Sequence, residues 1–185
     1  MTTLDYPRHF VLLVGATAVL ALGLLVQPPW APVADRLFVL FGLSGALHAV
    51  TVVLALQGEA SWGVRVGFVA AATALSVAAP VGGLGIASLL QLNMVLTVFV
   101  ALALASAFGA VSCWLLVRGF WAPFLSRGSL VTTIAACEVA MFFTAMAGNV
   151  LQIPRDPLAP ALWWLGFSIA LCIADRRHAL ASSRA

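Results

Sequence analysis

Six long apolar runs, separated by short segments that hold nearly all of the charged side chains, constrain what this chain can fold into. A membrane-spanning helix needs about 20 mostly apolar residues, and the runs approach that length. The pattern predicts an all-α, polytopic membrane protein in which residues 1–185 form a single transmembrane domain of six helices. The expected spans are approximately residues 9–27, 37–57, 62–79, 93–117, 129–150 and 160–174.

Clusters of proline and glycine are expected to break the chain after the first span, after the third span and before the sixth. The stretch of residues 81–92 is still apolar, which fits a re-entrant or interfacial segment. The breaking residues are Pro28, Pro29 and Pro32, then Pro80, Gly82, Gly83 and Gly85, and finally Pro154, Pro157 and Pro160.

The scarcity of charge excludes several classes of protein. Charged residues make up 8% of the chain and hydrophobic residues 63%, whereas a soluble domain is about a quarter charged. So few charges cannot solvate a soluble surface, which argues against a soluble domain, a disordered chain, a nucleic-acid-binding protein and a disulfide scaffold. The expected partner is the lipid bilayer, with no nucleic acid.

The arginines indicate an orientation. Two of the nine, Arg36 and Arg155, lie beside acids on one side of the expected topology, and seven lie on the side that holds both termini. The positive-inside rule therefore predicts cytoplasmic termini. Because all basic residues are arginine, as in GC-rich bacterial genomes, we expect the bacterial inner membrane. The seven are Arg8, Arg65, Arg118, Arg127, Arg176, Arg177 and Arg184.

An internal repeat is suggested by the pattern Leu-Leu-Val-x3-Trp-Ala-Pro-x3-Arg, which occurs at residues 24–36 and 115–127. The offset relates the first three spans to the last three, and two halves of three spans would be inverted in the membrane. Such inverted repeats occur in transporters, with the solute path at the repeat interface. The pattern also fits a coincidence between similar helix ends, because the two halves of the sequence barely match elsewhere.

Two ionisable side chains fall deep inside spans, where charge is costly and polar groups are functional candidates. His48 and Glu138 each lie nine residues from the cytoplasmic end of their span, so they are expected at matching depth. Ser44 and Thr51 share a helical face with His48, and Asn149 shares one with Glu138. Two interpretations are open: a protonatable transport or binding site, or a polar clamp between two helices.

The other polar residues give weaker indications of a functional site. Asn93, before the fourth span, and Asn149 could line an entrance or cap helix ends. The three cysteines lie inside spans without a CxxC pair and are expected to be apolar fillers. His9 and His178 are expected outside the spans, which argues against a haem held by two histidines. We therefore expect no cofactor and no metal site.

Small residues spaced four apart occur in most spans and predict close helix packing. One such stripe is Ala101, Ala105, Gly109 and Cys113 in the fourth span. The stripes fit either a tightly packed monomer or an interface with a second copy or a partner membrane subunit.

Three functions remain open. The first is a small carrier or channel for a small solute or ion, with proton coupling through His48 and Glu138. The second is an accessory or assembly subunit of a larger membrane complex. The third is an intramembrane lipid-modifying enzyme, which is the least favoured because the chain carries no recognisable catalytic motif.

Overall fold

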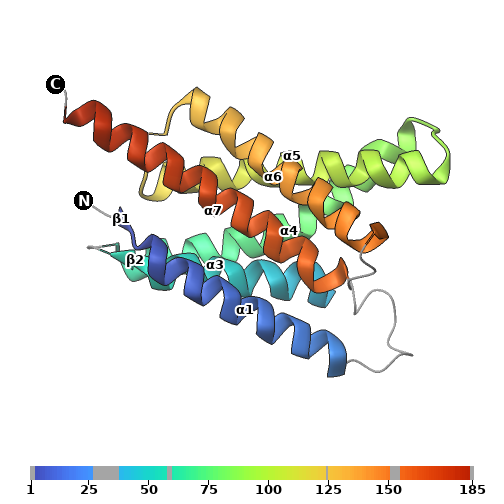
Figure 1. The fold of residues 1–185 in the computed structure, drawn as a ribbon, viewed down its shortest axis with the longest axis horizontal. Helices are drawn as coiled ribbons and strands as arrows, with labels where there is room; N and C mark the ends of the chain where they lie inside the picture. The colour runs from blue at the N-terminus through green and yellow to red at the C-terminus, as the bar shows by residue number, and fades with distance from the viewer. Residues whose placement is uncertain (1–2, 27–37, 58–59, 124, 151–154, 184–185) are drawn as a thin grey trace.

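The computed structural model describes residues 3–26, 38–57, 60–123, 125–150 and 155–183, and it is helical almost throughout (Figure 1). The prediction of an all-α fold is confirmed. A π-helix, η1 (Phe38–Leu43), runs directly into α3 (Ser44–Ala55), and two-residue strands β1 (Thr3–Leu4) and β2 (Leu56–Gln57) pair antiparallel. The other helices are α1 (Tyr6–Val26), α4 (Trp62–Leu89), α5 (Met94–Phe120), α6 (Arg127–Val150) and α7 (Arg155–Ser182).

The predicted break at Pro80 is wrong, and the last helix begins earlier than predicted. Helix α4 continues through Pro80 to Leu89 as one helix of 28 residues, so residues 81–89 are neither re-entrant nor a separate interfacial segment. Proline costs one hydrogen bond, whereas ending the helix in an apolar stretch would leave several backbone groups without partners. Helix α7 begins at Arg155 rather than at residue 160 and contains Pro160 as its sixth residue, just past the first four positions, whose N–H groups have no intrahelical partner.

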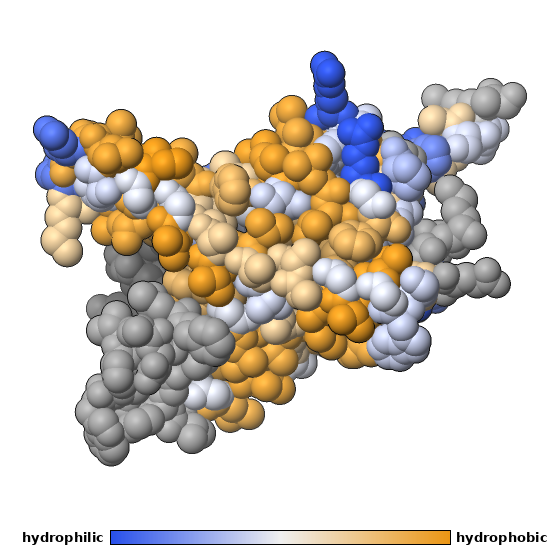
Figure 2. Space-filling model, turned by 180° about the vertical axis from the view of Figure 1, so that it is seen from behind, coloured by the Kyte–Doolittle hydropathy of each residue, from blue (hydrophilic) through white to orange (hydrophobic). Residues whose placement is uncertain are grey.

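Three helices in the described part of the chain are long and apolar enough to cross a membrane: Tyr6–Gly23, Trp62–Leu89 and Leu96–Phe120. Leu40–Ala55 is a shorter apolar helix. Large apolar side chains such as Val11, Trp62 and Met94 are mostly exposed. Figure 2 shows hydrophobic residues over much of one face, with strongly hydrophilic residues confined to a few places near its edges. The chain is therefore a helical membrane protein.

The helices form a bundle in which most chain neighbours are also neighbours in space. Helices α4, α5, α6 and α7 pack pairwise in sequence, and α1 packs against both α3 and α7, which closes the arrangement. Helix α1 begins and α7 ends at the same end of the bundle (Figure 1). The first copy of the proposed repeat lies mostly outside the described residues, so the repeat stays a prediction.

Small residues make the closest helix contacts. A Cβ added at Gly83 of α4 would lie 2.5 Å from the Ala101 carbonyl oxygen and 2.9 Å from the Ala105 nitrogen of α5. A Cβ at Gly109 would lie 3.1 Å from the Trp163 ring of α7. The stripe predicted on the fourth span is therefore occupied by α4 and α7 of the same chain, which matches the tightly packed alternative at these positions.

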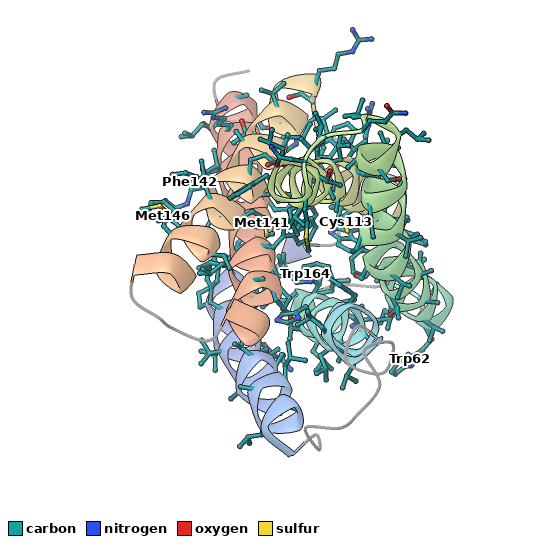
Figure 3. The ribbon with its side chains drawn as sticks, turned by 90° about the vertical axis from the view of Figure 1, so that its right-hand side faces the viewer. Trp62, Cys113, Met141, Phe142, Met146 and Trp164 are labelled. Carbon is teal, nitrogen blue, oxygen red and sulfur yellow. The ribbon has the colours of Figure 1, made fainter. Side chains whose placement is uncertain are left out.

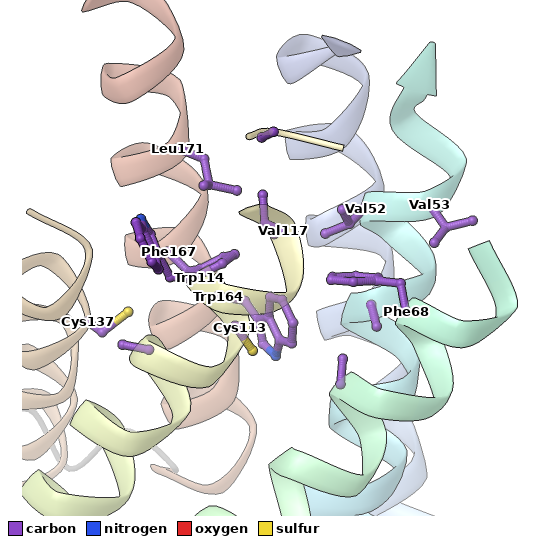
Figure 4. Close-up of a cluster of buried hydrophobic side chains, with 14 of the residues drawn as sticks. Val52, Val53, Phe68, Cys113, Trp114, Val117, Cys137, Trp164, Phe167 and Leu171 are labelled. Carbon is purple, nitrogen blue, oxygen red and sulfur yellow. The ribbon is translucent and has the colours of Figure 1, made fainter. Parts of the chain in front are cut away.

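The hydrophobic core lies where α3, α4, α5 and α7 meet (Figure 4). Five of its members, Phe68, Trp114, Val117, Trp164 and Phe167, are each at most 2% exposed. Phe68 packs edge-on against Trp121 with 4.7 Å between ring centroids. Trp164 and Phe167 of α7 belong to this core, and polar side chains of the same helix meet those of α1 and α5.

We expect Gly83→Ala to lower the free energy of unfolding by about 1–3 kcal/mol, because the added methyl group overpacks the α4–α5 contact. Gly82→Ala is the matched control, since nothing lies within 4 Å of a Cβ at Gly82. It should be neutral or stabilising by up to about 1 kcal/mol through helix propensity. Unfolding in sodium dodecyl sulfate followed by circular dichroism measures both, and equal effects of the two substitutions would contradict this contact.

Candidate functional site

His48 lies in α3 with no exposed surface. Its Nδ1 atom is 2.7 Å from the backbone carbonyl oxygen of Ser44 and 3.2 Å from the Ser44 hydroxyl. A carbonyl oxygen can only accept, so Nδ1 carries the proton and donates it. In the neutral ring, Nε2 is then an unprotonated lone pair. This atom is buried and has no hydrogen-bond partner.

Trp164 of α7 covers one face of the His48 ring. The two rings are stacked, with 5.9 Å between centroids and 8° between planes. Figure 3 shows Trp164 in the interior of the bundle, in contrast to Trp62, Phe142 and Met146 near its edge. The imidazole is therefore fixed in orientation by a backbone hydrogen bond on one side and an indole on the other.

His9 belongs to the same site, and the expectation that it lies outside the spans is wrong. It has no exposed surface, because the first turns of α1 pack against the middle of α7. Its Nε2 atom is 2.7 Å from the hydroxyl of Ser168 in α7, and its Nδ1 atom is 3.4 Å from the hydroxyl of Thr51 in α3. We call His9, Ser44, His48, Thr51 and Ser168 the histidine cluster.

The two hydroxyl groups around His9 are already committed as donors. Ser168 donates to the Trp164 carbonyl and Thr51 to the His48 carbonyl, each at 2.7 Å. Each hydroxyl oxygen is therefore an acceptor toward His9. A neutral imidazole has one N–H and can satisfy only one of them, whereas an imidazolium can satisfy both. The cluster is thus arranged to take up a proton without rearranging its hydroxyl groups.

A second polar group lies around Glu138 of α6. The Glu138 carboxylate has a hydrogen bond with Ser106 of α5, and the Trp163 indole N–H of α7 donates to the same Ser106 hydroxyl at 3.2 Å. The Oε1 atom of Glu138 is buried without a hydrogen-bond partner. We call Glu138, Ser106 and Trp163 the glutamate cluster.

The two clusters lie at the same level of the bundle, but His48 and Glu138 do not form a hydrogen-bonded pair. Trp163 and Trp164 are neighbours in α7, and their rings are 5.3 Å apart. One belongs to the glutamate cluster and the other stacks on His48. The matching depth of His48 and Glu138 in the membrane stays a prediction. The two side chains are not hydrogen-bonded to each other, since Nε2 of His48 and Oε1 of Glu138 each lack a hydrogen-bond partner.

The remaining predicted residues separate into two groups. Ser44 and Thr51 both contact His48, as a shared helical face requires. Asn93 instead caps α5, where its side-chain oxygen accepts from the Leu96 N–H at 3.0 Å and the residue is exposed. The side chain of Asn149 lies outside the described part of the structure, so its expected alignment with Glu138 stays a prediction.

The cysteines Cys113 and Cys137 are buried members of the hydrophobic core. Among the described residues, no group of three or more histidine, cysteine or acidic side chains is placed to hold a metal ion. The imidazole, carboxylate and hydroxyl groups of the two clusters can form hydrogen bonds and bind protons.

Comparison with known proteins yields no match: no protein-family model, curated protein or solved structure resembles this chain significantly.

We predict that ¹⁵N nuclear magnetic resonance of the protein in lipid will show His48 protonated at Nδ1 and unprotonated at Nε2. The Ser44 carbonyl accepts from Nδ1, which fixes this tautomer. Assignment follows from loss of the signals in the His48→Gln variant. A ring protonated only at Nε2 would contradict the geometry of the histidine cluster.

Proposed function

We propose that this protein is a small carrier or channel in the bacterial inner membrane, and that movement of its solute or ion is coupled to proton binding at His48. The observation that carries the proposal is the unprotonated, unpartnered Nε2 atom of a fully buried histidine. Ionisable groups in membrane interiors are typical of ion and proton pathways.

The unpartnered atoms favour transport over a polar clamp. A clamp that only holds helices together is most stable when all of its polar atoms are paired, and each buried unpaired group costs about 1–3 kcal/mol. Here His48 Nε2 and Glu138 Oε1 are both unpaired. A site that binds and releases a proton or a small polar solute needs unpaired polar atoms to which the proton or solute can bind.

The histidine cluster is suited to bind one proton rather than two. His9 lies close enough to interact electrostatically with His48, so a positive charge on one imidazole would disfavour a second positive charge on the other. The proton would bind at Nε2 of His48 or at His9, where two hydroxyl oxygens accept. Glu138 would provide a second protonatable position at the same level of the bundle.

The proposed topology has six spans with both termini in the cytoplasm. The sequential packing of the helices and the position of the ends of α1 and α7 at one end of the bundle support an even number of spans. Arg8 lies in the first turn of α1, Arg118 lies in the last turn of α5, and Arg127 begins α6. Arginines at these helix ends are what the positive-inside rule requires of cytoplasmic segments.

Proton flux into proteoliposomes tests the proposal. Vesicles that contain the dye pyranine are given a potassium gradient with valinomycin, without solute and with a panel of amino acids, carboxylates, sugars and inorganic ions. We expect acidification above that of protein-free vesicles, reduced to the protein-free rate by His48→Gln. Glu138→Gln should abolish the flux or uncouple it from the solute, because it removes the carboxylate of the glutamate cluster.

The matched control is His178→Gln, which removes an imidazole near the end of α7, beyond the expected sixth span. It should keep wild-type flux, and circular dichroism should show that all variants are folded. Wild-type flux in His48→Gln, or no flux above protein-free vesicles with any probe, would contradict the proposal.

An accessory subunit of a larger membrane complex is the second candidate, and it rests on the hairpin of α4 and α5. Figure 1 shows this hairpin extending past the other helices. Exposed apolar side chains, including Leu84, Leu89 and Met94, cover it. A helix of 28 residues is about 42 Å long, which exceeds the roughly 30 Å hydrocarbon core.

Purification in mild detergent at native expression level tests this alternative. A subunit should recover a stable partner protein through the hairpin, and Leu89→Asn with Met94→Asn should release it because both side chains are exposed and apolar. Recovery of the chain alone would contradict it. The lipid-modifying enzyme gains no support, because His48 and Glu138 have separate partners rather than one shared substrate position.

A further inference from the structure

A pocket of about 250 Å³ lies between the start of α6 and the C-terminal half of α7. These two segments lie side by side at the end of the bundle where α7 ends (Figure 1). The pocket is separate from both clusters described above, because none of their residues lines it. Its independence of the proposed transport means that each can be tested without the other.

The polar lining of this pocket is positive. Arg177 and His178 of α7 line one side, and the hydroxyl-bearing residues Ser126, Ser129 and Thr132 line the other. None of the residues that line it carries a carboxylate. An arginine guanidinium presents a planar set of N–H donors that matches the oxygens of a phosphate or carboxylate.

The rest of the lining is apolar and points to a lipid. Leu125 and Ile173 line the pocket together with small residues of α7. Ile173 and Ile169, one helical turn earlier in α7, are exposed on the surface of the bundle. An acyl chain could lie along these side chains while its phosphate contacts Arg177. A soluble anion has no apolar part that could contact these side chains.

The position along the helix agrees with a headgroup. Arg177 lies three residues after the last expected span, residues 160–174, where the hydrocarbon region is expected to end. Basic pockets between transmembrane helices on the cytoplasmic side are suited to anionic lipid headgroups. We propose that this pocket binds a phosphate group, and that its source is an anionic phospholipid of the cytoplasmic leaflet.

Native mass spectrometry of the protein in non-ionic detergent tests the site, with phosphatidylglycerol and phosphatidylcholine as probes. We expect phosphatidylglycerol to bind in preference to phosphatidylcholine. Arg177→Gln should weaken its binding by about tenfold, since it removes a charge-assisted hydrogen bond. Arg177→Lys keeps the charge without the planar donor set, so its affinity for phosphatidylglycerol should lie between those of the wild type and Arg177→Gln.

Arg176→Gln is the matched control, because it removes the same charge one residue earlier and Arg176 does not line the pocket. Its binding of phosphatidylglycerol should stay near that of the wild type. Equal losses in Arg176→Gln and Arg177→Gln, or no preference for phosphatidylglycerol, would overturn the site.

A competition arm identifies the source of the phosphate. Inorganic phosphate and glycerol phosphate are added to the protein with bound phosphatidylglycerol. No displacement at equal concentration supports the lipid headgroup. Displacement by either soluble anion would overturn the lipid source while the loss in Arg177→Gln still identifies the pocket as a phosphate site. Thermal unfolding of each variant in the same detergent confirms that the comparison is between folded proteins.

Discussion

The requirement that polar groups be satisfied within the protein governs this structure, because the hydrocarbon core of a bilayer offers no water to pair with them. The backbone meets it through helices, and hydroxyl side chains meet it by donating to carbonyls of their own helix. Thr73 donates to Val69, Thr133 to Ser129 and Thr144 to Ala140, at 2.7 to 2.9 Å. Against this background, two unpaired buried atoms, on His48 and Glu138, stand apart.

Helix α7 is the element that connects the two sites. Gly166 allows it to approach α6, since a Cβ there would lie 2.7 Å from the Ala136 carbonyl oxygen. The same turns of α7 present Trp163 to Ser106, Trp164 to His48 and Ser168 to His9. A small movement of this helix would therefore change both clusters together, which is the coupling that a carrier with two protonatable positions needs.

Much of the fold follows from the sequence, because apolar run length and helical spacing are local properties. The six runs correspond to the six helical stretches, and the spacing of Ser44, His48 and Thr51 correctly places them on one face. The errors come from packing. Pro80 does not end α4, and Gly83 in the continued helix packs closely against α5. The sequence predicts His9 outside the spans, because its burial depends on contact with α7, a helix far away in the chain.

The partners of the site were the least predictable part. Ser106 and Ser168 each lie in an apolar run, and nothing in their own helices distinguishes them from other small residues. Trp163 and Trp164 look like interfacial aromatics, yet both point into the bundle and Trp164 is only 2% exposed. Their roles depend on contacts between helices far apart in the chain. The sequence pattern identifies a buried polar residue but not what it contacts.

Aqueous access to position 48 tests most directly whether the histidine cluster is a transport site or a fixed clamp. The measurement uses His48→Cys in a chain whose three native cysteines are replaced by alanine, with Ala72→Cys as the reference, because Ala72 is equally buried. Both are treated in vesicles with a membrane-impermeant methanethiosulfonate reagent from each side. The transport account predicts modification at position 48 from at least one side and none at position 72. Protection of both positions, or equal rates at both, would contradict it.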